Sequence, residues 1–177
     1  GKTKFELYYS FSLNELKFER SENLKTTDIK EFVILKNLDN NRIYQNTRSL
    51  NLEYDKEKNL KKDSFIGQIN MEIPFKNEDY TTFLRIYNNA NAKLGLVHQQ
   101  LVDKDYSGNS LMISDIEFSY DIKASVEDNE FTKNGLQIIP HTGGILNKNE
   151  NVFIYFELYN LTLDKDGDGR YKIEYIV

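Results

Sequence analysis

The most regular feature of the sequence is an alternation of apolar and polar positions with a period of two. In segment 5–11 the odd positions are Phe, Leu, Tyr and Phe, and the even positions are Glu, Tyr and Ser. Such a period is typical of strands that bury one face. The pattern predicts no helix and about twelve strands, over residues 5–11, 16–20, 30–38, 41–47, 49–54, 65–73, 82–88, 94–102, 112–120, 135–139, 152–160 and 170–176.

The gaps between these segments are rich in Asn, Asp and Gly, the residues that best tolerate turn conformations. Pro74 and Pro140 each fall at the end of a predicted strand, where a missing amide donor does little harm. Many short strands separated by such turns are typical of antiparallel sandwiches. We therefore predict an all-β fold of two immunoglobulin-like antiparallel β-sandwich domains.

A change in charge composition divides the chain near Gly108. Residues 1–107 carry 17 basic and 16 acidic side chains, whereas residues 108–177 carry 6 and 12. The first part has enough strands for a complete sandwich of about 100 residues, and the second has too few. The sequence thus predicts domains 1–107 and 108–177, the second being a truncated sandwich. Because a truncated sandwich has an open sheet edge, a homodimer or pairing between the two domains is one way to cover it.

Overall charge and composition exclude several classes of function. With 23 Lys and Arg against 28 Asp and Glu, the net charge is -5, so the positive surplus needed for nucleic-acid binding is missing. No segment approaches the roughly 20 apolar residues of a membrane span. The absence of Cys removes disulfides and Cys-ligated metals. We expect no nucleic-acid partner and no transmembrane segment in this chain.

The acidic loop with Asp164, Asp166 and Asp168 is a weak candidate for a calcium site, because alternating oxygens in a Gly-containing loop suit a hard cation. An EF-hand loop counted from Asp164 needs Glu at its twelfth position, and that residue is Tyr175. The EF-hand interpretation therefore fails. A hairpin turn that joins strands 152–160 and 170–176 needs the same residues, and it is the favoured interpretation.

The sequence offers no convincing catalytic group. His98 and His141 are the only histidines, too few for a multi-His metal centre, and no Gly-x-Ser-x-Gly motif accompanies them. A hydrolase is therefore the weakest hypothesis, and we predict no catalytic residue. The 12 Tyr and 11 Phe suit a sandwich core, although exposed rings could also form a carbohydrate platform.

The segment VFIYFELYNLTLD at 152–164, followed by RYKIEYIV at 170–177, resembles the C-terminal region of bacterial GWxTD-domain proteins. In that family we expect the pattern "vyiYfEiYNLtxdxdGxxxYxixYxv". Segments 111–118 (LMISDIEF) and 134–140 are similar to further parts of the family in the same order, and LYYS at 7–10 is similar to its opening. The Gly-Trp-x-Thr-Asp motif itself is absent because the chain has no Trp, so nothing known of that motif transfers.

The resemblance implies a bacterial protein of unknown function that is exported, periplasmic or located in the cell envelope. It also marks Tyr155, Glu157, Tyr159 and Asn160 as candidate binding residues. Glu157 is expected either to face solvent or to accept hydrogen bonds from a neighbouring loop, and Asn160 to cap a turn at the end of its strand. For these residues structural roles are favoured over binding.

The leading hypothesis is a non-catalytic β-sandwich scaffold or protein-interaction module, not an enzyme and without a cofactor. Its expected partners are another protein or neighbouring domains of the same chain. The chain starts at Gly1 without Met and ends in an apolar run, so we expect it to be excised from a longer exported protein. The alternative is a carbohydrate- or calcium-binding sandwich that uses exposed Tyr residues and the loop at 164–168.

Overall fold

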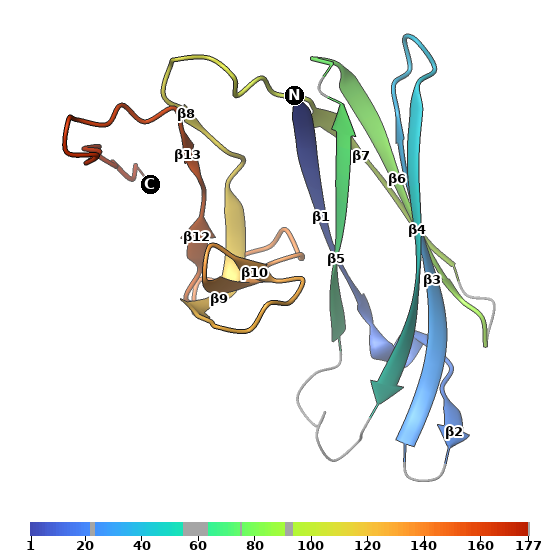
Figure 1. Cartoon of the computed structure of the whole chain (residues 1–177). Helices are drawn as coiled ribbons and strands as arrows, with labels where there is room; N and C mark the ends of the chain where they lie inside the picture. The colour runs from blue at the N-terminus through green and yellow to red at the C-terminus, as the bar shows by residue number, and fades with distance from the viewer. Residues whose placement is uncertain (22–23, 55–63, 75, 91–93, 177) are drawn as a thin grey trace. The chain divides into compact units, whose positions relative to one another are not determined.

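The computed structural model describes residues 1–21, 24–54, 64–74, 76–90 and 94–176. The chain divides into two compact units, Gly1–Lys104 (unit 1) and Asp105–Val177 (unit 2), which are described separately (Figure 1). The boundary predicted after residue 107 lies three residues further along the chain. All sheets are antiparallel, and the prediction of an all-β fold is confirmed.

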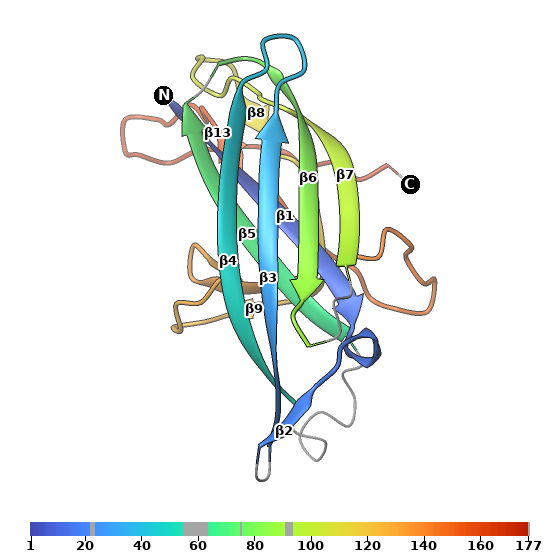
Figure 2. The same ribbon diagram turned by 90° about the vertical axis from the view of Figure 1, so that its right-hand side faces the viewer.

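Unit 1 is a sandwich of two sheets. Its strands are β1 (Lys2–Ser12), β2 (Glu19–Ser21), β3 (Leu24–Lys36), β4 (Ile43–Tyr54), β5 (Ser64–Pro74), β6 (Asp79–Asn88) and β7 (Leu94–Val102), with one short 3-10 turn at Leu13–Glu15. β1 and β5 form one sheet. In the other sheet β3 pairs with β4 on one side and with β6 on the other, and β7 follows β6 (Figure 2).

The core of unit 1 lies between these two sheets and follows the period of two. Phe5 and Tyr9 of β1 are buried, and so are Ile69, Met71 and Ile73 of β5. From the larger sheet the buried apolar residues of the cluster are Val33, Leu35, Tyr80 and Leu84. Because all of these residues have the inward parity of their strands, burial on one face explains the alternation that the sequence displays.

One ion pair also lies on the inward side of the larger sheet. The Glu31 side chain on β3 is 1% exposed, and Arg48 lies directly opposite on the neighbouring strand β4. Arg48 Nε donates a hydrogen bond of 2.6 Å to Glu31 Oε2. The predicted strands 41–47 and 49–54 are therefore one continuous strand, since the polar residue that seemed to separate them takes part in the ladder.

Unit 2 has shorter strands and a smaller core. They are β8 (Met112–Ile113), β9 (Glu117–Ala124), β10 (Thr132–Lys133), β11 (Leu136–Pro140), β12 (Phe153–Tyr155) and β13 (Leu158–Tyr159). One sheet has the order β10-β11-β9-β12, and β13 pairs with β8 in another. Among the described residues of this unit only Ser119, Ile138 and Pro140 are buried.

Two predicted strands of unit 2 are each divided in the structure. Segment 112–120 becomes β8 and β9, and segment 152–160 becomes β12 and β13. Between the pairs Tyr155↔Glu117 and Leu158↔Ile113 the register shifts by one residue, as in a β-bulge. The Ser114 hydroxyl accepts from the Glu157 amide at 2.9 Å, so a side chain replaces a ladder acceptor at this point.

The predicted strand at 170–176 is wrong. A single antiparallel bridge, Leu163↔Gly169, closes the turn before it, and residues 170–176 form no strand. Tyr171, Ile173 and Tyr175 alternate as a strand would, yet all three are exposed. A segment with alternating residues forms a stable strand only where another surface covers its apolar side chains. The described part of the chain places no such surface against residues 170–176.

Candidate functional site

Three of the four candidate binding residues, Tyr155, Glu157 and Tyr159, gather around the Glu157 carboxylate. Together with Asn134 they form a group that we call the tyrosine–glutamate cluster. Glu157 accepts from the Tyr155 hydroxyl at 2.8 Å and from the Tyr159 hydroxyl at 2.6 Å. Asn134 Nδ2 donates to Glu157 Oε1 at 3.2 Å and to the Tyr155 hydroxyl at 3.0 Å. Glu157 thus accepts a hydrogen bond from a neighbouring turn, one of the two expectations from sequence.

Aromatic and charged neighbours hold the cluster in place. The rings of Tyr106 and Tyr159 have centroids 4.6 Å apart. Lys133 Nζ lies 5.3 Å from the centroid of the Tyr155 ring and donates to Glu117 Oε2 at 2.7 Å. Burial and then the hydrogen bond to Glu157 raise the pKa of Tyr159 above its ordinary value, so this phenol remains a donor further into the alkaline range.

Asn160 does not belong to this cluster. It has a positive φ of 60°, a conformation that Asn tolerates better than most residues, and follows the last residue of β13. Its Nδ2 donates to the carbonyl of Tyr106 at 3.0 Å and to that of Ser110 at 3.1 Å. The amide therefore fastens a loop to the end of the strand, which is the structural role that the sequence favoured.

We predict that Glu157→Ala lowers the free energy of unfolding by about 1–2 kcal/mol, because three donors lose a charged acceptor in a half-buried place. Urea denaturation followed by circular dichroism measures the change. Glu150→Ala, at an exposed site in the same unit, is the control and is expected to change stability by less than about 0.5 kcal/mol. Equal stability of the two variants would contradict a structural role for the cluster.

The acidic loop is a tight turn. Asp164 Oδ1 accepts from the backbone N–H groups of Asp166 at 2.9 Å and Asp168 at 3.0 Å, and Gly167 has a φ of 85°. Asp166 and Asp168 have exposed side chains. Within the described ranges, no three His, Cys, Asp or Glu residues are grouped so that they could hold a metal ion. The geometry thus uses Asp164 as a turn residue.

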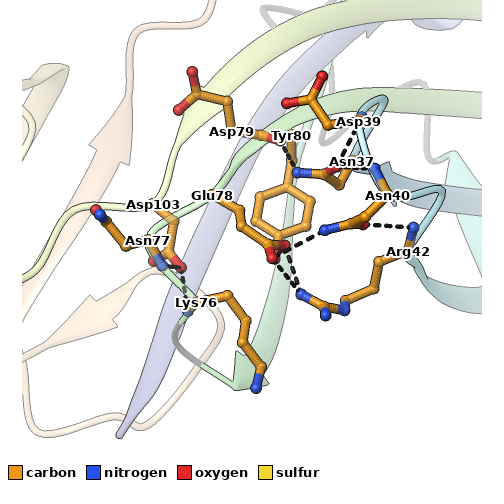
Figure 3. A network of polar contacts seen from close by, with 10 residues as sticks. All are labelled: Asn37, Asp39, Asn40, Arg42, Lys76, Asn77, Glu78, Asp79, Tyr80 and Asp103. Atoms are coloured by element: carbon orange, nitrogen blue, oxygen red, sulfur yellow. Dashed lines mark hydrogen bonds and ion pairs between the residues drawn. The ribbon is translucent and has the colours of Figure 1, made fainter.

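Unit 1 contains a polar network that the sequence did not reveal (Figure 3). Both carboxylate oxygens of Glu78 accept from Arg42 Nη1 at 2.6 Å. Asn40 Nδ2 and the Tyr80 hydroxyl also donate to Glu78, at 3.0 and 3.2 Å. Burial raises the pKa of Glu78, but the bonds from Arg42, Asn40 and Tyr80 outweigh it and leave that pKa below its ordinary value. The network joins the turn after β3 to the start of β6.

Asp103 forms the second centre in Figure 3 and is 1% exposed. Its Oδ2 accepts from the backbone N–H groups of Lys76 at 2.9 Å and Asn77 at 3.2 Å. Its Oδ1 accepts from the Thr3 hydroxyl. A single carboxylate therefore connects the end of β7 to the turn before β6 and to the start of β1. These contacts join segments far apart in sequence, and no local pattern announces them.

Tyr80 gives unit 1 a testable alkaline transition. It is 1% exposed, and burial, then its bond to Glu78, raises the pKa of Tyr80 to about 12, against about 10 when unfolded. The folded state therefore keeps this proton longer. The contribution of this proton to the free energy of unfolding is complete below about pH 10, and it is lost as the pH rises through about 12.

Tyr80→Phe should reduce the pH dependence of unfolding in that window, by up to about 2–3 kcal/mol in total. Urea midpoints measured between about pH 8 and 12 test this. Identical slopes in the variant and the parent would show that Tyr80 is not the group responsible.

The side of the larger sheet that faces away from β1 and β5 carries a second feature, which we call the outer patch. It consists of two neighbouring rows across β3, β6 and β7, namely Ile34–Phe83–His98 and Phe32–Arg85–Leu96. The Phe83 and His98 ring centroids are 6.4 Å apart, and Arg85 Cζ lies 5.9 Å from the centroid of Phe32. Leu96 is 63% exposed. The run Phe-Val-Ile-Leu at 32–35, apolar on both parities, was the signal for this face in the sequence.

The two histidines thus have different surroundings. His98 belongs to the exposed outer patch, whereas His141 is half-buried in unit 2, with its ring centroid 4.3 Å from that of Tyr120. Each ring lies against an aromatic neighbour.

No family model, curated protein or solved structure matches this chain. Across the described ranges, no helix has the length and apolar character required to cross a bilayer.

Proposed function

We propose that this chain is a non-catalytic β-sandwich module that binds another protein through the outer patch of unit 1. The observation that carries the proposal is the outer patch itself, where aromatic and aliphatic side chains surround Arg85 on a face that β1 and β5 do not cover. Aromatic residues and Arg are the side chains that interface centres favour, and they carry most of the binding energy there.

The charges of the outer patch indicate what the partner carries. Arg85 lies within the two rows, and the register places no carboxylate in them. Lys30 and Lys36 lie on the same face, in the next rows on either side. A partner with an apolar anchor and acidic residues around it fits this arrangement, because the acidic groups meet cations and the anchor meets Phe and Leu side chains.

The tyrosine–glutamate cluster supports the same proposal by its chemistry. Glu157 already accepts three hydrogen bonds from within unit 2, and Asn160 holds a loop. A sugar or a cation at this place would have to compete with these internal bonds. We also propose, on the resemblance to GWxTD-domain proteins alone, that the module belongs to a longer exported bacterial protein.

Affinity capture tests the proposed function. The full chain, tagged, is used to capture proteins from an extract of the organism that carries the gene, and a captured protein is then purified. We expect Phe83→Ser with Arg85→Glu to weaken its binding at least about tenfold, which corresponds to about 1.4 kcal/mol. Phe118→Ser with Lys123→Glu, two exposed sites of unit 2, is the matched control and should bind as the parent does.

Raising the salt concentration should slow association of the captured protein, since the patch is cationic. A partner that binds the outer-patch variant and the parent equally well would overturn the proposed site.

A further inference from the structure

The backbone edge of β7 is a feature of unit 1 that the proposed function does not use, although Leu96 and His98 of this strand belong to the outer patch. In the described part of the chain β7 pairs only with β6, so it forms one edge of the larger sheet (Figure 2). Its pairing with β6 runs from Leu94 to Val102 without a bulge or register shift. Antiparallel strands alternate the direction of their backbone groups, so half of the N–H and C=O groups of β7 point away from β6.

β7 also lacks the devices that keep sheet edges from pairing. Such edges normally carry charges, Pro, a bulge or an inward-pointing charged residue. The sequence of β7 is LGLVHQQLV, with no Asp, Glu, Lys, Arg or Pro. Val97 and Val102 are 60% and 59% exposed, and residues 95–100 are all exposed.

The other long strands at sheet edges in unit 1 do carry such devices. β4, at the opposite edge of the same sheet, directs Arg48 inward to Glu31. β1 contains Lys2, Lys4 and Glu6, and β5 contains Glu72 and ends in Pro74. The contrast singles out β7 as the edge that is open to another strand.

We infer that β7 pairs antiparallel with β7 of a second copy of this chain, so that the larger sheets of two copies become one continuous sheet. Because β7 carries no Asp, Glu, Lys or Arg, the second copy meets no like-charge repulsion from such residues at the edge. Residues that face each other in an antiparallel pair lie on the same side of the sheet. Because side chains alternate sides along β7, two facing residues must both have odd numbers or both have even numbers. The register that uses all nine residues has its two-fold axis at His98, the midpoint of β7.

This register makes definite pairs. Val97 faces Gln99 of the second copy, Leu96 faces Gln100, and the two His98 residues face each other. The two outer patches then lie on the same side of the joined sheet, next to one another. The dimer therefore presents two binding surfaces to a partner, although its formation does not depend on the proposed function.

Charge substitutions test the pairing. In Val97→Lys with Gln99→Lys, each Lys faces a Lys of the other copy, and we expect dissociation to monomers of 20.8 kDa in sedimentation velocity. In Val97→Glu with Gln99→Lys the facing charges are opposite, and the dimer should persist. Thr47→Lys with Ser49→Lys, two exposed sites on the β4 edge, is the matched control and should remain dimeric.

Cysteine cross-linking tests the register, and the chain has no Cys of its own to interfere. His98→Cys should form an intermolecular disulfide under mild oxidation, because facing Cβ atoms are about 4.5–5.5 Å apart. Gln100→Cys should form no such disulfide. In this register position 100 of one copy faces position 96 of the other, so the two substituted positions are four residues, or about 13 Å, apart along the strand. A parent chain that is monomeric at about 100 μM, well above the Kd of a stable dimer, would overturn the inference. So would a dimer that the double-lysine variant leaves intact.

Discussion

Arg48→Met is expected to lower the free energy of unfolding by about 3–5 kcal/mol, because it leaves the Glu31 carboxylate at its buried position without the guanidinium that faces it. Replacing the other partner, in Glu31→Leu, should lower the free energy of unfolding by only about 1–2 kcal/mol. The Arg48 side chain is 32% exposed and its flexible stem can carry the charge to water. A larger loss of stability in Arg48→Met than in Glu31→Leu is expected only where the carboxylate is the buried partner. In an ion pair exposed on both sides, the two losses would be about equal.

The double variant, with both changes, should return close to the stability of the parent, since apolar side chains of similar size replace a buried ion pair at little cost. Urea denaturation of all four proteins completes the cycle. Because the double variant recovers both single losses, the coupling energy is their sum, about 4–7 kcal/mol. Lys2→Met, which removes a surface pair with Glu72, is the control and should cost less than about 1 kcal/mol. If Arg48→Met costs no more than this control, the ion pair does not stabilise the fold.

Removing this pair has a second consequence at the β4 edge. An inward-pointing charge discourages a foreign strand from pairing, because pairing would bury the charge further. The stable double variant should therefore associate through β4 into species larger than the β7-paired dimer, at concentrations where the parent does not. Light scattering measures this association, and the β4 substitutions Thr47→Lys with Ser49→Lys should suppress it.

The period of two predicted much of unit 1 because each strand there has one covered face. Residues 5–11 and 65–73 have their odd positions in the core, as the pattern required. The prediction failed where burial and polarity disagree. Glu31 and Arg48 occupy inward positions, and their mutual bond, which spans two strands, cannot be seen in either strand alone.

In unit 2 the prediction failed for the opposite reason, because apolar side chains that were expected to be buried are exposed. Segment 170–176 alternates as well as any strand, but its apolar side chains are exposed. Alternation is a property of the segment, whereas burial depends on what the rest of the chain brings to it. Tyr155, Glu157 and Tyr159, which the resemblance marked as candidates, do lie together in the structure. Their fourth member, Asn134, comes from a turn after β10 and could not be deduced from their spacing.

The Asp103 centre illustrates the part of the fold that a sequence cannot show. An aspartate one residue after a predicted strand reads as an ordinary turn residue. In the structure it is buried and accepts from Lys76 and Asn77, and Asn77 has a φ of 52°. These donors lie 26 and 27 residues away, and Thr3 lies 100 residues away. Only the closed sandwich brings the three segments together.

Asp103→Ala is therefore expected to lower the free energy of unfolding by about 2–4 kcal/mol, because two backbone amides and one hydroxyl lose a charged acceptor inside the protein. Asp103→Asn should cost less, about 1–2 kcal/mol, because the amide oxygen of Asn still accepts a hydrogen bond. The remaining loss arises because the amide NH2 group, itself a donor, then faces N–H or O–H donors. Thr3→Val, which removes one of the three bonds, should cost about 1 kcal/mol.

Amide hydrogen exchange adds a readout that global stability does not supply. In Asp103→Ala the amides of Lys76 and Asn77 should exchange faster than the amides in the middle of β6, because the loss is local to the turn. Asp105→Ala, an exposed aspartate that bonds only to nearby Ser107 in the described contacts, should leave both amides protected. Unchanged exchange at Lys76 and Asn77, together with a stability loss below about 1 kcal/mol, would mean that water replaces the carboxylate at this point. The start of β1 and the turn before β6 would then not depend on this carboxylate.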